Sequence, residues 1–161
     1  MHKSDDVVAD LGYLTLGTRL KRLAEYLQAG VAETLSNRGY EVQPGQLPVL
    51  MAIAEGDGPS VAELVIALGL TQPGISRTLA TLKQAGLVNI QIDKNDGRAR
   101  RAYLTPSSAA LMDELRAEVF GKIAAAAAQL CEGLDLLNIL GVVEERNREL
   151  PFPERIRKAR P

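Results

Sequence analysis

Two capped helices joined by a glycine turn, followed by an alternating segment, most restrict the fold of this chain. Ser60 and Glu63 form a capping box at the start of the first predicted helix, and Gly69 interrupts that helix. Thr71 then caps a second helix, which tolerates Pro73 in its first turn. This order predicts a helix-turn-helix, and the alternating pattern after it predicts a β-strand.

The alternating segment is the first half of a predicted hairpin with a basic tip. Residues 87–92 alternate apolar and polar side chains, and Asn95-Asp96-Gly97 is a turn signal. Residues 101–104 form the returning strand. A hairpin directly after a helix-turn-helix is the wing of a winged helix.

Helical periodicity continues on both sides of this unit. Apolar side chains repeat every three or four residues between Asp6 and about Arg38, which predicts one long helix. They are Leu16, Leu20, Leu23, Leu27, Val31 and Leu35. Another helix should begin near Gln43-Pro44, and Pro48 should bend it or delay its start.

The second half of the chain predicts further helices. Thr105-Pro106 supplies a cap and a first helical residue, and the apolar stripe that follows runs to Leu130. A last helix is expected from Leu136 to Leu150, and the segment 151–161 is expected to be an extended tail. Aromatic residues make up 4% of the chain and Trp is absent, so the core must be aliphatic, which suits packed helices. The predicted fold class is mainly α with a small β-hairpin wing.

The amino-acid composition and the residue types that are missing exclude several classes of protein. The single cysteine, Cys131, allows no intramolecular disulfide, which fits a reducing cytoplasm, and no apolar run approaches the roughly 18 residues of a membrane span. Paired catalytic histidines, a nucleophile motif, a metal-ligand cluster and a phosphate-binding glycine loop are all missing from the sequence. We therefore predict no enzyme activity, no metal and no cofactor.

The predicted second helix, residues 71–85, has the surface that major-groove recognition needs. A helix in that groove turns its first turns toward base edges, so its exposed side chains must be short or polar. Gln72, Pro73, Ser76 and Arg77 satisfy this condition. Glutamine can make two hydrogen bonds to adenine, and arginine can make two to guanine.

Charge is concentrated in the same region. The chain has a formal net charge of -1, but residues 71–105 carry six cationic and two acidic side chains. The remainder is therefore acidic, and positive charge gathers where phosphates would be met. The basic tip at 93–101 could enter the minor groove, where narrow A·T tracts concentrate negative potential.

Three sequence segments resemble the MarR family of bacterial regulators. They are Leu-Gly-Leu-Thr-Gln-Pro-Gly-Ile-Ser-Arg at 68–77, Leu-Lys-Gln-Ala-Gly-Leu-Val at 82–88 and Asp-Gly-Arg-Ala-Arg-Arg-Ala-Tyr-Leu-Thr-Pro at 96–106. The resemblance implies a homodimer built through the first and the last two helices. It also implies that Asp96 orients Arg98 toward the minor groove. Asn95 departs from the family, which commonly has arginine there.

These observations together predict a homodimeric, sequence-specific DNA-binding transcriptional regulator, cytoplasmic and most simply a ligand-responsive repressor. The predicted partner is double-stranded DNA with a near-palindromic site. The predicted DNA-binding residues are Thr71, Gln72, Pro73, Ser76, Arg77, Thr81, Lys83, Lys94, Asp96, Arg98, Arg100 and Arg101. The predicted parts are an N-terminal dimerisation helix (1–40), the winged helix-turn-helix (41–105), C-terminal dimerisation helices (106–150) and a tail (151–161). The alternative is a winged-helix protein–protein interaction module that does not read DNA.

Three further features have two interpretations each. Arg19, Arg22 and Tyr26 either line a pocket for the small aromatic acid that the resemblance implies as an effector, or are surface or interface residues. Cys131 is either a redox sensor or a small packed residue, and the family's peroxide sensors resemble one another in carrying that cysteine in the first helix, which has none here. His2, the only histidine, lies near the chain terminus and is a poor catalytic or metal-binding candidate.

Overall fold

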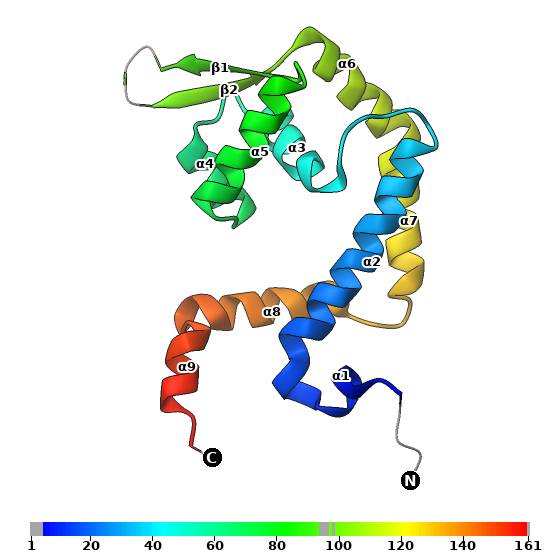
Figure 1. Cartoon of the computed structure of the whole chain (residues 1–161), viewed down its shortest axis with the longest axis vertical. Helices are drawn as coiled ribbons and strands as arrows, with labels where there is room; N and C mark the ends of the chain where they lie inside the picture. The colour runs from blue at the N-terminus through cyan, green and yellow to red at the C-terminus, as the bar shows by residue number, and fades with distance from the viewer. Residues whose placement is uncertain (1–4, 94–96, 98, 161) are drawn as a thin grey trace. The chain divides into compact units, whose positions relative to one another are not determined.

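The computed structural model describes residues 5–93, 97 and 99–160, and they form two compact units (Figure 1). The first unit ends at Phe120 and the second begins at Gly121. The first contains α1 (Val7–Asp10), η1 (Gly12–Thr15), α2 (Leu16–Ser36), η2 (Pro44–Gln46), α3 (Leu47–Glu55), α4 (Val61–Leu68), α5 (Gln72–Gln84), β1 (Val88–Ile92), β2 (Arg100–Leu104), α6 (Pro106–Leu115) and η3 (Arg116–Phe120). The second contains α7 (Gly121–Leu130), α8 (Leu136–Glu149) and α9 (Phe152–Lys158). Within the described ranges, no helix has the length and apolarity needed to cross a membrane.

The N-terminal region differs from the single helix that periodicity predicted. Asp6 caps the short α1 by accepting a hydrogen bond from the Ala9 N–H, and η1 separates α1 from α2. The Thr15 hydroxyl donates to the Val8 carbonyl across this break. The prediction of one continuous helix from Asp6 is therefore wrong, because local side-chain bonds compensate the backbone groups that the break leaves free.

The start of α3 follows the prediction made from its prolines. Gln43 and Gln46 form a capping box around the 3₁₀ turn η2, and α3 begins only at Leu47. Pro48 occupies the second position of α3, where its missing N–H costs no helical hydrogen bond. The expected delay of the helix is confirmed.

The helix-turn-helix forms as the capping residues predicted. Ser60 and Glu63 exchange hydrogen bonds at the start of α4, and the Thr71 hydroxyl accepts from the Gly74 N–H at 3.3 Å at the start of α5. Gly69 ends α4 with φ at +63°, a left-handed conformation that a side chain would strain. These three signals fix the turn between the two helices.

The core of the first unit lies between α3, α4, α5, the hairpin, α6 and η3. The described side chains that are at most 1% exposed are Leu35, Val49, Leu50, Leu64, Ile75, Leu82, Val88, Ala102, Ser108, Met112, Leu115 and Val119. Ser108 is the polar member, and its hydroxyl donates to the Leu87 carbonyl at the start of the hairpin. This bond joins α6 to the base of the wing.

The wing is an antiparallel pair with a short third segment. Val88 pairs with Leu104 and Ile92 pairs with Arg100, which sets the register of β1 against β2. On the other edge of β2, the Ala102 N–H donates to the Pro59 carbonyl at 3.0 Å, and Ser60 bridges Arg101. The α3–α4 turn is therefore hydrogen-bonded to the wing.

Two predictions for the C-terminal half need correction. The helix expected from residue 106 to 130 contains a π-helical turn at Arg116–Phe120, which replaces the uniform period that the apolar stripe suggested. The tail expected to be extended forms α9 instead. Pro153 is tolerated in the first turn of α9, and Asn147 Oδ1 accepts a hydrogen bond from the Phe152 N–H at 3.0 Å. These two features start a new helix. The prediction treated Pro151 only as the end of the preceding helix and therefore missed it.

Candidate nucleic-acid interface

The two faces of α5 are sharply divided. Ile75, Leu79 and Leu82 are between 0 and 4% exposed and hold the helix in the core. On the opposite side, Gln72 and Arg77 are exposed. The polar face of α5 is therefore presented to solvent in a fixed orientation, as major-groove reading requires.

Polar side chains along α5 divide into those bonded within the helix and those left available. Thr71 caps the helix, and the Thr81 hydroxyl donates to the Arg77 carbonyl at 3.1 Å. Gln72, Ser76 and Arg77 have no side-chain hydrogen bond within the described part of the chain. These three retain their full donor and acceptor capacity for a ligand.

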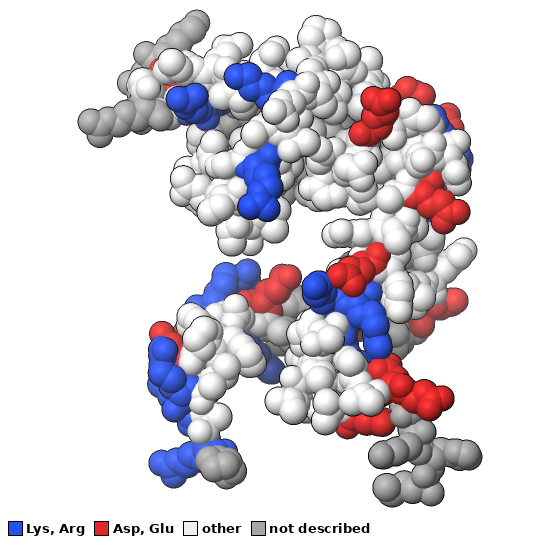
Figure 2. Space-filling model, viewed as in Figure 1, with Lys and Arg blue, Asp and Glu red and all other residues white. Residues whose placement is uncertain are grey.

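A cleft separates α5 from the wing, and basic side chains line it. It has a volume of about 220 Å³ and an apolar floor that includes Leu79 and Ile90. Ser76, Lys83 and Arg100 supply its polar lining. Lys83 and Arg100 are exposed and form no ion pair with a described residue. Basic surface lies over the face that carries α5 and the hairpin, as Figure 2 shows, so this cleft suits an anion.

Arg101 is bonded differently from its neighbour Arg100. Its Nε donates to Asp93 Oδ2, and its guanidinium also donates to the Gly58 carbonyl at 2.8 Å. The Glu63 carboxylate lies 3.5 Å from the same guanidinium. The hydrogen bond to Asp93, and after it the negative charges of Asp93 and Glu63, raise the pKa of Arg101. Arg101 therefore joins both wing strands to the start of α4.

Nine of the twelve predicted DNA-binding residues lie in the described part of the chain. They gather on α5 and on the adjoining strand β2. Lys94, Asp96 and Arg98, which the hairpin tip was predicted to contribute, lie outside the described residues. Pro73 is exposed in the first turn of α5 beside Gln72.

Comparison with known proteins identifies the family that this fold resembles. A model of the MarR family matches residues 40–99, which contain the α3–α5 region and the first wing strand, β1, and end just before β2. The winged helix of this chain is therefore similar to that of the MarR family. The predicted resemblance and the predicted fold class are confirmed.

Solved structures extend the likeness to most of the chain. A MarR regulator from Methanosarcina mazei Go1 is 24% identical with a TM-score of 0.63, over 84% of this chain and 97% of that one. An Escherichia coli MarR mutant complexed with operator DNA is 20% identical with a TM-score of 0.67, over 91% and 100%. Bordetella bronchiseptica BpsR, whose DNA binding is regulated by 6-hydroxynicotinic acid, is 22% identical with a TM-score of 0.61, over 94% and 97%.

Sequence reasoning missed the anchor between the wing and α4. It counted Asp93 as an acidic residue in a basic loop and Arg101 as a free cation. The available signal was their position on opposite arms of a predicted hairpin, where opposite charges pair across strands. The contribution of Gly58 had no local signal, because its carbonyl reaches Arg101 across 43 positions of sequence.

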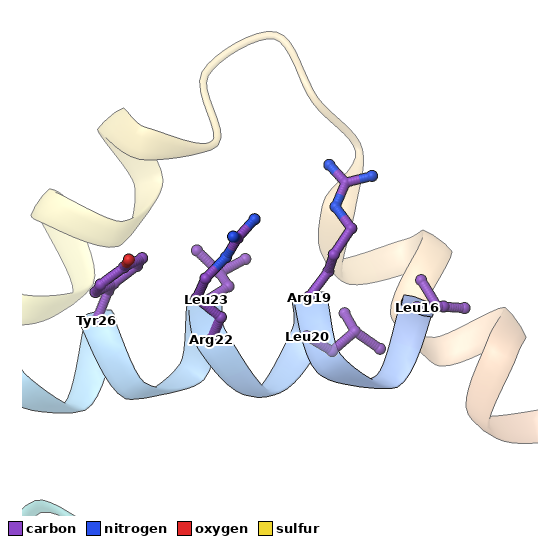
Figure 3. Close-up of a pocket in the computed structure, with 6 residues that line it drawn as sticks. All are labelled: Leu16, Arg19, Leu20, Arg22, Leu23 and Tyr26. Carbon is purple, nitrogen blue, oxygen red and sulfur yellow. The ribbon is translucent and has the colours of Figure 1, made fainter. Parts of the chain in front are cut away.

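The long helix α2 has a second hollow. It has a volume of about 400 Å³ and lies along α2, where Leu16, Arg19, Leu20, Arg22, Leu23 and Tyr26 line it. Arg19, Arg22 and Tyr26 project from one side of the helix (Figure 3). Arg22 makes a two-point ion pair with Asp6, at 2.7 and 3.1 Å, whereas Arg19 forms no ion pair with a described residue.

Other candidate sites have less support from the structure. The described residues contain no group of three or more side chains that could hold a metal ion. Cys131 follows the end of α7, is partly exposed and forms no disulfide. His2 lies outside the described residues.

Proposed function

We propose that this chain is a sequence-specific DNA-binding transcriptional regulator that places α5 in the major groove and the hairpin in the minor groove. One observation carries the proposal: α5 buries its apolar stripe completely while Gln72, Ser76 and Arg77 stay exposed and available for hydrogen bonds. Lys83 and Arg100 add positive charge beside them, where a phosphate backbone would pass. The DNA complex of the related E. coli protein supports the same use of this fold.

We infer that the active form is a homodimer. The leucines of α2 that face one side of the helix are between 42 and 46% exposed, namely Leu16, Leu20, Leu23 and Leu27. A contiguous apolar stripe of this kind on a helix is expected to be covered by another surface. A twofold pair would present two copies of α5, and its target would be a near-palindromic duplex with half-sites about one helical turn apart.

Selection of duplexes from a random-sequence library tests this function. We expect the purified protein to enrich one near-palindromic sequence and to bind it more tightly than a scrambled duplex. Gln72→Ala should relax the preference at one base pair of each half-site by about 1–3 kcal/mol. Gln84→Ala, at the far end of α5, is the matched control and should leave the preference unchanged.

The alternative, a winged-helix module that binds only proteins, predicts a different result. Selection would then return no enriched sequence, and binding to any duplex would be equally weak. Uniform weakening by Gln72→Ala on all sequences would also count against base reading by α5.

We further propose that a small aromatic acid releases the regulator from DNA, so that the chain acts as a cytoplasmic repressor. Arg19 could pair with a carboxylate, and Tyr26 and the leucines of the α2 hollow could contact the ring. BpsR, which responds to 6-hydroxynicotinic acid, supports this class of effector. A ligand can release DNA only if it binds the DNA-incompetent state more tightly.

Competition between acid and duplex tests the effector. 6-Hydroxynicotinic acid and benzoic acid are the probes, and DNA affinity is measured with and without each of them. We expect at least one acid to weaken DNA binding, and Arg19→Met to abolish that response without changing DNA affinity in the absence of acid. Lys21→Met, a nearby exposed cation outside the hollow, should preserve the response.

A further inference from the structure

We propose that Arg101 is not a DNA contact but a positioning residue, which holds the wing at a fixed angle to the helix-turn-helix. The inference rests on the proposed function and changes the role of one residue that sequence alone assigned to DNA. It also predicts opposite roles for two adjacent arginines of the same strand.

Side chains alternate between the two faces of β2. Successive residues of a strand point to opposite faces, so the side chains of Arg100 and Arg101 have different surroundings. Arg100 lines the cleft beside Ser76 and Lys83, on the side where Ala102 packs into the core. Arg101 lies on the other face and bonds to the α3–α4 turn.

Charge compensation separates the two arginines further. Two carboxylates, Asp93 and Glu63, lie within ion-pair distance of the Arg101 guanidinium. The Asp93 side chain is only 9% exposed, so the stronger pair is shielded from solvent and from salt. A phosphate would have to replace these partners, whereas Arg100 has no carboxylate to leave among the described residues.

The contacts of Arg101 reach three elements at once. Asp93 directly follows β1, Gly58 belongs to the α3–α4 turn, and Glu63 is the third residue of α4. Glu63 also accepts from the Ser60 N–H at 2.6 Å, so the helix cap and the wing anchor share one carboxylate. Rotation of the wing away from α4 would break these bonds together.

The same face of the wing carries a second fixed point. The Tyr103 ring packs against Gly58 so closely that a Cβ at Gly58 would lie 2.3 Å from it. Arg101 and Tyr103 therefore hold the α3–α4 turn at successive positions of one strand face. These contacts tie the base of the wing to the α3–α4 turn, and the proposed function needs a fixed wing angle for entry into the minor groove.

An alanine at Asp93 gives results of opposite sign under the two hypotheses. If Arg101 binds phosphate, Asp93→Ala removes a competing negative charge and should tighten DNA binding. If Arg101 positions the wing, the same change should weaken binding about fivefold, because only the fraction of molecules with a correctly placed wing is competent. The probe is the duplex selected by the wild-type protein, and thermal unfolding of each variant checks that it remains folded.

Salt dependence supplies a second measurement, because losing a phosphate contact changes it and losing a positioning residue does not. Arg100→Met should reduce the slope of log affinity against log salt by about 0.9, the value for one lost phosphate contact. Arg101→Met should weaken binding and leave that slope unchanged. Equal loss of slope in both variants would overturn the inference.

Mobility of the wing can be measured directly. A nitroxide at Gly97→Cys, in a Cys131→Ser background, reports motion near the hairpin tip without DNA. We expect Arg101→Met to increase this motion and Arg101→Lys to increase it less, because lysine can keep one ion pair but not the forked set. Arg100→Met should leave it unchanged, and equal motion in all variants would contradict the positioning role.

These outcomes separate the inference from the proposed function. If the wild-type protein selects no duplex, the DNA-binding function fails, while the mobility result still decides whether Arg101 anchors the wing. If the wild type binds DNA and Asp93→Ala tightens that binding, the function holds and the positioning role is wrong.

Discussion

The helices α5 and α2 have the same kind of sequence pattern but different surroundings. Both carry an apolar stripe at helical spacing, and in α5 that stripe is at most 4% exposed. In α2 only Leu35, at the C-terminal end, is buried to this degree, and Leu20 is 46% exposed. Periodicity therefore indicates which face of a helix is apolar and favours burial, but not whether residues of the same chain bury it.

The ends of α2 explain this difference along one helix. Near its C-terminus, the Tyr40 hydroxyl donates to Glu114 at 2.8 Å, and Arg38 lies 3.7 Å from Glu118. These bonds join the segment after α2 to α6 and η3, where Leu35 reaches the core. Toward the N-terminus the leucines remain exposed, and this is the stretch that we assign to the dimer.

The largest effect is expected from a cavity under α5. Leu82→Ala should lower the free energy of unfolding by about 2–5 kcal/mol, because Leu82 is fully buried and the core cannot fill the space. Denaturant unfolding measures it, and Leu82→Met is the volume-matched control, with an expected loss below about 1.5 kcal/mol. A loss as small for alanine as for methionine would mean that α5 is not held by the core.

A charge in the α2 stripe should act on assembly. Leu20→Glu should weaken the dimer at least about 100-fold, since each protomer loses a buried leucine worth about 1.5–3 kcal/mol. Sedimentation equilibrium measures the change. Leu70→Glu is the matched control, because Leu70 is 47% exposed but lies in the turn before α5. Equal dissociation by both variants would remove the distinction between the two helices.

A methyl group at Gly58 tests how closely the wing is fitted to the α3–α4 turn. Gly58 has φ at +65°, and a Cβ there would overlap the Tyr103 ring, so Gly58→Ala should cost about 1–3 kcal/mol. Thermal unfolding measures it. Gly97→Ala, where a Cβ meets nothing within 4 Å, should cost far less. Stability that is equal in both variants would mean that the turn can move away from the wing.

The winged helix could be predicted from sequence because its signals are local. The Ser60 capping box, the Gly69 turn and the Thr71 cap each act within a few residues, and all three form as predicted. The exposed face of α5 follows from the same spacing that buries Ile75. For α5, then, local signals were sufficient to orient the residues of the candidate site.

The remaining features depend on contacts between distant residues. Arg101 meets Gly58 across 43 positions, and Arg22 meets Asp6 across 16. Their charges can be counted in the sequence, but a count does not say which arginine is already paired. For this reason Arg100 and Arg101 were assigned the same role, and the break between α1 and α2 was overlooked.

The smallest effect is expected at the ion pair that joins α1 to α2. Hydrogen bonds from Arg22, and then from the Ala9 N–H, lower the pKa of Asp6 to about 2. A carboxyl group with a lower pKa in the folded chain stabilises it at pH values above its ordinary pKa of about 4, and this contribution is lost as the pH falls toward 2. We expect Arg22→Met to return the Asp6 pKa toward 4 in an NMR titration, and Asp6→Asn to loosen α1 at neutral pH with little change in global unfolding, because exposed pairs contribute little. Asp5→Asn controls for the loss of charge alone. If Arg22→Met leaves the pKa of Asp6 unchanged, α1 is held to α2 by its backbone hydrogen bonds. The structure of the N-terminal region would then depend on local signals, as that of the winged helix does.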